Sequence, residues 1–275
     1  MNMRYKEFGK TGMKASEMAL GTWGIGGAGW DDNPEETRID AICAAVENGV
    51  NFIDTAPAYN AGAAECLVGK ALKQSGTRQR VIVATKCGNF YMGNGTYVRD
   101  GHYDKIIQQC DDSLKNLQTD YIDLGMIHYV DSEEEWEKIQ HSDYLDYVME
   151  LKRSGTIRHI GLSSHNPKVA RKAALSGYVE MILFSINPAF DMLPASENID
   201  TLFADSYDAS LRGIDADRAL LYRTCEQNDV GITVMKGFAG GRLFDEKRSP
   251  FGIRLTPVQC IHYALTRPAV GSILC

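Results

Sequence analysis

One pattern repeats along the whole chain: a short apolar run is followed by a stretch with helical spacing of apolar residues. Several of the runs are apolar throughout, which is typical of strands buried on both faces of a parallel sheet. The predicted strands are 17–20, 51–54, 81–86, 121–128, 159–164, 181–186, 231–236 and 270–275. They recur about every 36 residues, the length of one β/α unit, and eight such units predict an α/β fold, the (β/α)8 TIM barrel.

Helix start and stop signals lie between these runs. Asn33 and Pro34 are the expected N-cap and first residue of a helix that ends at Gly49, and Thr256-Pro257 repeats the start signal. Further helices are predicted over 64–73, 104–117, 142–154, 167–176, 215–228 and 256–266.

The two ends of the chain carry further expectations. Residues 4–16 alternate around a Gly-Lys-Thr-Gly turn and predict a short β-hairpin before the first strand. The chain stops at Cys275, at the end of the eighth strand, so the last helix is expected to be missing and the sequence truncated. No linker composition interrupts the rhythm, which predicts one domain over residues 1–275.

Composition narrows the functional classes. The net charge of −7 gives no basic surface for phosphates, so nucleic acid is not an expected partner. No apolar run is long enough for a membrane span, and the N-terminus lacks a signal-peptide core. The seven cysteines form no C-x-x-C pair, so no metal site is predicted. Scattered thiols of this kind predict a reduced, cytoplasmic protein.

A glycine motif offers a competing fold. Residues 24–29 read G-x-G-x-x-G after a strand, and Asp54 ends the next strand, as in a dinucleotide-binding Rossmann fold. That fold requires a helix directly after the third glycine, whereas here residues 30–34 read WDDNP. Two carboxylates would repel a pyrophosphate at that point. The segment is therefore better interpreted as a loop on the catalytic face of a barrel.

Four polar residues gather at the predicted carboxyl ends of neighbouring strands, where barrel enzymes place their chemistry. Asp54, Lys86 and His128 end strands two, three and four. Tyr59 follows Asp54 in the next loop. Each residue alone has an ordinary structural interpretation, but four together predict an active site. We call these four residues the tetrad.

The tetrad suits acid catalysis at a carbonyl. A lysine ammonium beside the phenol lowers the high pKa of tyrosine, and an aspartate supplies the counter-charge. A neutral histidine can donate a second hydrogen bond to the carbonyl oxygen. No side chain delivers hydride, so a nicotinamide cofactor is implied.

Successive segments resemble the aldo-keto reductases, in the right order over nearly the whole chain: 5–27, 49–72, 81–88, 117–131, 157–167, 232–243 and 255–274. The resemblance implies a (β/α)8 barrel and reversible reduction of aldehydes or ketones. It matches the tetrad to the family's catalytic residues, with Tyr59 as the acid, Lys86 modulating its pKa, Asp54 supporting Lys86 and His128 orienting the substrate.

The resemblance also implies the cofactor contacts. The expected cofactor is NADP(H) in preference to NAD(H), and the matching positions, which include Asp54 of the tetrad, are Gly21, Thr22, Trp23, Ser163, Ser164, Met235, Lys236, Gly237, Phe238 and Gly240. Three positions depart from the family pattern. Ser164 replaces an asparagine, Leu183 a glutamine and Met235 a tyrosine, which puts the tightness of cofactor binding in doubt.

The sequence gives little information about the identity of the substrate. A long loop, 88–101, is expected to border the pocket, and an aromatic wall suited to sugars or aromatic carbonyls is predicted from Trp23, Trp30, Phe90, Tyr91, Tyr129 and Phe190. The expected partner is a small carbonyl or alcohol, and the oligomeric state cannot be predicted. The alternative hypothesis is a cofactor-binding regulatory or scaffold protein on the same fold.

Overall fold

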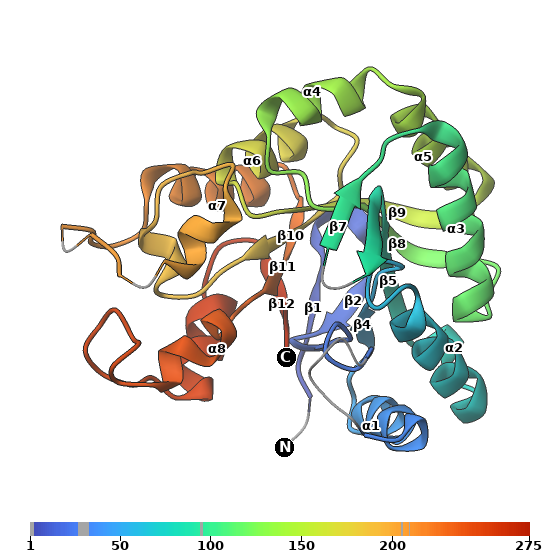
Figure 1. Cartoon of the computed structure of the whole chain (residues 1–275), viewed down its shortest axis with the longest axis horizontal. Helices are drawn as coiled ribbons and strands as arrows, with labels where there is room; N and C mark the ends of the chain where they lie inside the picture. Colours follow the sequence, from blue (N-terminus) through green and yellow to red (C-terminus); the bar gives the residue numbers. More distant parts are fainter. Residues whose placement is uncertain (1–2, 27–32, 94–95, 205, 209) are drawn as a thin grey trace. The chain divides into compact units, whose positions relative to one another are not determined.

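The computed structural model describes residues 3–26, 33–93, 96–204, 206–208 and 210–275. In this part of the chain, eight parallel strands follow one another in a closed barrel (Figure 1). They are β3 (Met18–Gly21), β4 (Phe52–Asp54), β5 (Ile82–Cys87), β8 (Ile122–Ile127), β9 (Ile157–Ser164), β10 (Met181–Ser185), β11 (Gly231–Met235) and β12 (Val270–Leu274). The predicted barrel is confirmed, and each strand matches its predicted range to within two residues.

The chain divides into two compact units. The first is built mainly from Met18–His128 and Glu137–Gly161, and the second from Lys6–Glu17, Tyr129–Trp136 and Leu162–Cys275. The single domain expected over residues 1–275 stays a prediction.

In the first unit, β4, β5 and β8 pair in parallel with Ile53, Val83 and Leu124 fully buried. The helices that accompany these strands are α1 (Glu35–Glu47), α2 (Ala63–Ser75), α3 (Tyr103–Leu117) and α5 (Asp143–Ser154). Helix α2 buries the face that carries Leu67, Val68 and Leu72. It approaches the end of α3 so closely that a Cβ on Gly69 would lie 2.3 Å from the Asn116 carbonyl oxygen.

In the second unit, β10, β11 and β12 pair in parallel, and the helices are α6 (Pro167–Leu175), α7 (Ala216–Gln227) and α8 (Pro257–Leu265). Their starts follow local rules. Asn166 and Asp215 each accept a hydrogen bond from a backbone N–H of the first turn, and Thr256 forms a full capping box with Gln259.

The predicted N-terminal hairpin is present as β1 (Tyr5–Glu7) and β2 (Lys14–Ser16). Phe8, at its turn, is completely buried against the amino ends of β11 and β12. A Cβ on Gly271 would lie 2.2 Å from the Phe8 ring, so this close packing requires glycine there. The hairpin therefore covers the amino ends of these two strands.

Two local predictions were wrong, and one helix was not predicted. Residues 88–101 are not one open loop, because β6 (Asn89–Gly93) and β7 (Thr96–Arg99) pair as an antiparallel hairpin. A helix that we did not predict, α4 (Glu133–Gln140), precedes α5. Helix α1 begins at Glu35 with Pro34 as its N-cap residue, since the extended backbone of Pro34 (φ −53°, ψ 150°) lies outside the helix.

Short 3-10 turns complete the described elements: η1 (Gly9–Thr11), η2 (Arg78–Arg80), η3 (Phe190–Met192), η4 (Ile199–Phe203) and η5 (Ala239–Phe244). Within the described ranges, every helix is too short or too polar to cross a lipid bilayer. All seven cysteines are free thiols in the structure.

Candidate active site

The carboxyl end of β4 presents Asp54, which is almost fully buried. Its backbone carbonyl accepts two hydrogen bonds from Thr22, one from the backbone nitrogen and one from Oγ1, each at 3.0 Å. Gly21 pairs with Asp54 in the sheet register. Of the predicted cofactor contacts, Gly21 and Thr22 therefore hold the strand end that carries Asp54, whereas the Trp23 side chain is exposed.

Tyr59 lies in a tight loop between β4 and α2. Its backbone nitrogen donates to the Ala56 carbonyl, and the three residues after it, Asn60, Ala61 and Gly62, all have positive φ values. Left-handed backbone is unusual for asparagine and rarer for alanine, so the surrounding contacts must hold the loop in place. One such contact is the Asn60 amide, which donates to the Gly26 carbonyl at 2.7 Å.

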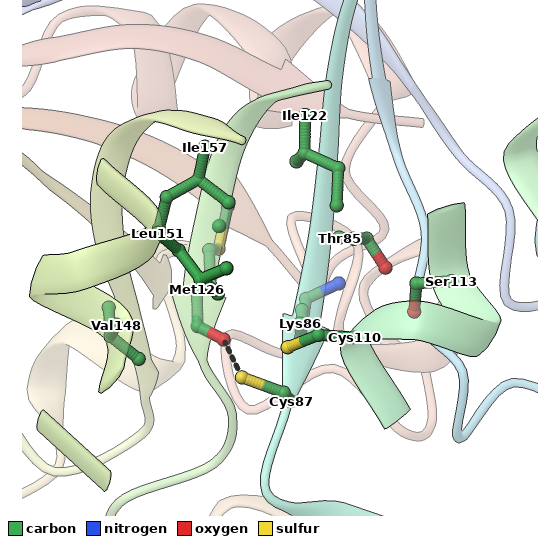
Figure 2. Close-up of a pocket in the computed structure, with 11 residues that line it drawn as sticks. Thr85, Lys86, Cys87, Cys110, Ser113, Ile122, Met126, Val148, Leu151 and Ile157 are labelled. Carbon is green, nitrogen blue, oxygen red and sulfur yellow. Dashed lines mark hydrogen bonds between the residues drawn. The ribbon is translucent and has the colours of Figure 1, made fainter. Parts of the chain in front are cut away.

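Lys86 is the centre of the tetrad. It lies near the end of β5, between Thr85 and Cys87 (Figure 2), and its side chain is 1% exposed. Its ammonium donates to Asp54 Oδ2 at 2.7 Å, to the Thr55 carbonyl at 2.7 Å and to Tyr59 Oη at 3.0 Å. An ammonium has three N–H donors, so all three are used and the buried charge is fully compensated.

These contacts set the proton states of the pair. Burial alone lowers the pKa of Lys86, but Asp54 and Tyr59 raise it above its usual value, which keeps the ammonium charged. Burial also raises the pKa of Tyr59 and outweighs the opposing effect of Lys86. The predicted lowering influence of Lys86 is present, but the expected net decrease is wrong. The phenol keeps its proton, and because its oxygen accepts from Lys86, that proton is left to donate elsewhere.

His128 follows β8, and its backbone nitrogen donates to the Cys87 carbonyl at 2.9 Å. Its ring stands edge-on to the Tyr59 ring, with 6.2 Å between the centroids. The structure thus brings all four tetrad residues together within the first unit.

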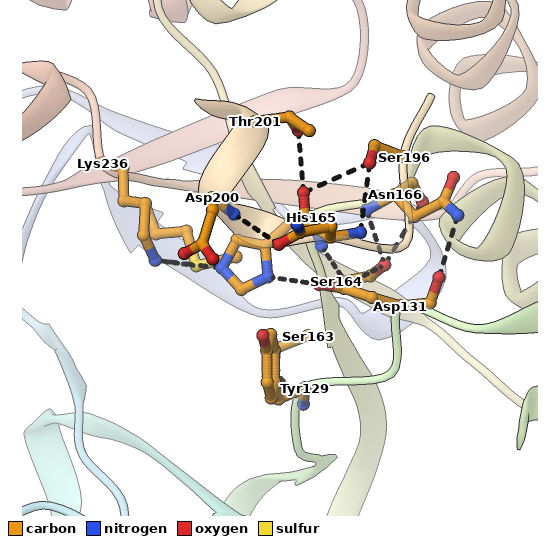
Figure 3. Close-up of polar contacts among 12 residues, drawn as sticks. Tyr129, Asp131, Ser163, Ser164, His165, Asn166, Ser196, Asp200, Thr201 and Lys236 are labelled. Carbon is orange, nitrogen blue, oxygen red and sulfur yellow. Dashed lines mark hydrogen bonds and ion pairs between the residues drawn. The ribbon is translucent and has the colours of Figure 1, made fainter. Parts of the chain in front are cut away.

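A second polar cluster lies in the second unit, and we call Asp131, His165 and Lys236 the histidine cluster (Figure 3). His165 is buried, with Nδ1 2.9 Å from Asp131 Oδ2 and Nε2 2.9 Å from the Lys236 ammonium. Since an ammonium can only donate, Nε2 is the acceptor and Nδ1 carries the proton. Burial and the neighbouring Lys236 lower the pKa of His165 to about 4, so the ring is neutral.

The predicted serine contacts lie beside this cluster. Ser164 Oγ donates to Asp131 Oδ1 at 3.0 Å and accepts from the backbone nitrogen of Asn166. Ser163 Oγ accepts from the backbone nitrogen of Tyr129 at 2.8 Å. The Ser164 hydroxyl is therefore committed to the turn after β9, while the Ser163 hydroxyl proton can serve a ligand.

The end of β11 and the loop after it contain the remaining predicted cofactor contacts: Met235, Lys236, Gly237, Phe238 and Gly240. The Lys236 carbonyl accepts from the Asn187 amide at 2.9 Å, which fixes the loop. A Cβ on Gly237 would lie 2.6 Å from Ile273 Cδ1, so a side chain at this position would require the Ile273 side chain to move. Gly240 and Gly241 have positive φ values, and no described atom lies within 4 Å of a Cβ built on either.

The aromatic wall stays a prediction, and the structure describes five of its six residues. Phe90 and Tyr91 line a cavity of about 420 Å³ with Pro57, Ala61 and residues of α3, within the first unit. Phe190 was wrongly assigned to the wall, because it is fully buried in a core cluster with Leu193 and Leu243. Trp30 lies outside the described residues, and Tyr129 belongs to the second unit.

Comparisons with known proteins decide the family. The model of the "Aldo/keto reductase family" matches residues 17–270. The chain belongs to this family. It is 41% identical over 162 residues to the aldo-keto reductase YhdN of Bacillus subtilis, covering 59% of this chain and 47% of the relative. It is 34% identical over 191 residues to the NADH-specific methylglyoxal reductase of Escherichia coli, covering 66% and 58%. The chain thus spans about half the length of these two relatives.

A solved structure agrees with the family assignment. The holo form of the aldo-keto reductase AKR11C1 from Bacillus halodurans matches with a TM-score of 0.74 at 25% identity, covering 98% of this chain and 85% of that one. The fold of this chain is therefore that of the family.

Proposed function

We propose that the tetrad catalyses the NAD(P)H-dependent reduction of an aldehyde or ketone to an alcohol, or the reverse oxidation. The observation that carries this proposal is the hydrogen bond from the Lys86 ammonium to Tyr59 Oη. It leaves a protonated phenol beside a buried cation, which is the arrangement that acid catalysis at a carbonyl oxygen requires.

In the direction of reduction, Tyr59 donates its proton to the carbonyl oxygen as negative charge develops there. The Lys86 ammonium stabilises the phenolate that remains, and Asp54 holds the ammonium in place at 2.7 Å. His128 donates a second hydrogen bond that orients the carbonyl. A reduced nicotinamide, when bound, supplies the hydride to the carbonyl carbon.

The loop after β11 fits the phosphates of such a cofactor. Gly240 and Gly241 have no side chains, so the backbone of this loop is accessible to a phosphate group at these positions. Lys236 contributes a positive charge at the same loop. We assign to these residues the phosphate contacts, together with Met235, Gly237 and Phe238, and to Ser163 a hydrogen bond to the nicotinamide amide. Ser164 supports this site through the turn after β9.

We propose NADP(H) as the preferred cofactor and a small carbonyl compound, with sugars included, as the substrate. One relative carries the name NADH-specific methylglyoxal reductase, so preference and substrate both need measurement in this chain. Seven free thiols support a cytoplasmic location for the protein.

The experiment is a panel of carbonyls, namely methylglyoxal, an aliphatic aldehyde, an aromatic aldehyde and an aldose, each assayed with NADPH and with NADH. The proposal expects cofactor oxidation with at least one carbonyl, and faster turnover with NADPH. Cofactor binding without turnover of any carbonyl, or of the matching alcohols in reverse, would favour the alternative of a cofactor-binding regulatory protein.

A further inference from the structure

Two cysteine side chains share a small cavity beside Lys86. Cys87 follows Lys86 on β5, and Cys110 lies on α3. Figure 2 shows both sulfur atoms facing the same space, which has a volume of about 20 Å³. A volume of that size holds one water molecule or another molecule of similar dimensions.

The two thiols differ in their surroundings. They are within hydrogen-bonding range of each other, and the contact with Cys110 lowers the pKa of Cys87 while burial opposes it. The same contact and burial raise the pKa of Cys110 well above its usual value. While it is protonated, the Cys87 thiol donates to the Met126 carbonyl oxygen at 3.8 Å (Figure 2). With Cys110 as the S–H donor to it, Cys87 is the thiol of the two that loses its proton more readily.

Tyr144 adds a second donor to Cys87. Its hydroxyl oxygen lies 3.2 Å from Cys87 Sγ and 2.9 Å from the Cys87 carbonyl oxygen. The single hydroxyl proton can serve either acceptor, so a rotation of the hydroxyl lets it stabilise a thiolate when one forms.

We propose that Cys87 and Cys110 form an oxidative modification site, at which hydrogen peroxide oxidises Cys87 and Cys110 closes a disulfide. This inference goes beyond the proposed carbonyl chemistry and does not depend on it. The modification lies one residue from Lys86 in the chain, so it acts directly beside the tetrad.

The reaction has two steps. The Cys87 thiolate attacks one oxygen of hydrogen peroxide: the S–O bond forms, the O–O bond breaks, and the leaving hydroxide takes up the thiol proton as water. The sulfur loses two electrons and the peroxide gains them. The Cys110 sulfur then attacks the sulfenic sulfur: the S–S bond forms, the S–O bond breaks, and hydroxide leaves as water with the Cys110 proton.

Other cysteines provide matched controls. Cys225 is buried, and desolvation raises its pKa to about 12, so it stays protonated and unreactive. Cys275 is exposed and could join two chains, so the test uses a Cys275→Ser background.

The test treats the protein with hydrogen peroxide, alkylates the remaining thiols in denaturant and maps the peptides by mass spectrometry. We expect the loss of two thiols and one cross-linked peptide that joins Cys87 to Cys110, both reversed by a thiol reductant. Cys110→Ser should stop at a sulfenic acid on Cys87 that dimedone traps. Cys87→Ser should leave Cys110 unmodified, and Cys225→Ser should behave like the parent protein.

An unchanged thiol number in the parent protein, or a disulfide between any other pair, would overturn the proposal. So would dimedone labelling of Cys110 instead of Cys87. Melting curves establish that each variant is folded. If one serine variant fails to fold, the peptide map of the parent protein still decides whether the bond forms.

Discussion

The tetrad and the histidine cluster each contain an aspartate and a lysine, but they place the transferable proton differently. In the tetrad the lysine is central, and the proton that can be transferred is on Tyr59, which is partly exposed. In the histidine cluster His165 is central, and both of its ring nitrogens are hydrogen-bonded, to Asp131 and to Lys236. The comparison teaches that residue types alone do not define an acid catalyst. The transferable proton must be on a side chain that can reach the substrate, as on Tyr59, and must not already be donated within the cluster, as on His165.

The largest effect is expected from Lys86→Met, which leaves the buried Asp54 carboxylate without its cation. Removing one partner of a buried ion pair costs about 3–5 kcal/mol, so the free energy of unfolding should fall by this amount in urea denaturation. The control is Lys70→Met, because Lys70 forms an exposed ion pair with Glu35, and exposed pairs contribute about 1 kcal/mol or less. An equal decrease in the free energy of unfolding in both variants would mean that water reaches the Asp54 carboxylate.

The double variant Asp54→Asn with Lys86→Met tests whether the stability loss comes from an unpaired buried charge. Because it removes both charges, it should regain much of the lost stability while remaining inactive. A double-mutant cycle over the four proteins measures the coupling. Additive losses would contradict a paired buried charge.

The next effect concerns the histidine cluster and pH. The folded pKa of His165 is about 4, whereas an unfolded histidine titrates near 6.5, so the unfolded state binds more protons between these values. Stability from this group is complete above about pH 6.5 and falls as the pH drops toward 4, by about 3 kcal/mol in total. The pKa of Asp131 is lowered despite its burial, chiefly by hydrogen bonds from His165, so its own contribution is lost only at still lower pH.

His165→Asn should therefore flatten the dependence of unfolding free energy on pH between 6.5 and 4, measured by denaturant titration at a series of pH values. His141→Asn is the control, since the His141 side chain is exposed and lies 3.8 Å from Glu137. A slope that persists in His165→Asn would place the acid-sensitive group elsewhere.

The smallest effect is expected at Thr22. Thr22→Val removes the hydroxyl that donates to the Asp54 carbonyl, and loss of one such hydrogen bond costs about 1 kcal/mol. Thr22→Ser keeps the hydroxyl and should retain most of the stability. If the two variants melt at the same temperature, the hydroxyl does not hold the strand end.

Much of this architecture could be predicted because each barrel strand carries its own local signal. Asp54, Lys86 and His128 were found together because parallel strands end on one side of a barrel, and Tyr59 follows in the adjoining loop. Their contacts confirm that the spacing brings them together.

The features that the sequence analysis missed are of two kinds. Some had a local turn or helix-start signal, and others depend on contacts between residues that are distant in the sequence. Asn94-Gly95 is a strong hairpin signal between β6 and β7, and three glutamates after Ser132 mark the start of α4. The histidine cluster joins loops that follow β8, β9 and β11, so no local pattern indicates it. The net pKa of Tyr59 depends on how deeply the phenol is buried, which the sequence does not give.

The most direct test of acid catalysis is Tyr59→Phe, which removes only the phenol oxygen and its proton. A general acid contributes about 10²–10⁴-fold, so carbonyl turnover should fall by that factor while the cofactor dissociation constant, from fluorescence titration, stays unchanged. Tyr178→Phe, in an exposed loop, controls for the loss of a hydroxyl. Turnover close to that of the parent enzyme in a folded Tyr59→Phe protein would contradict the assignment of Tyr59 as the proton donor.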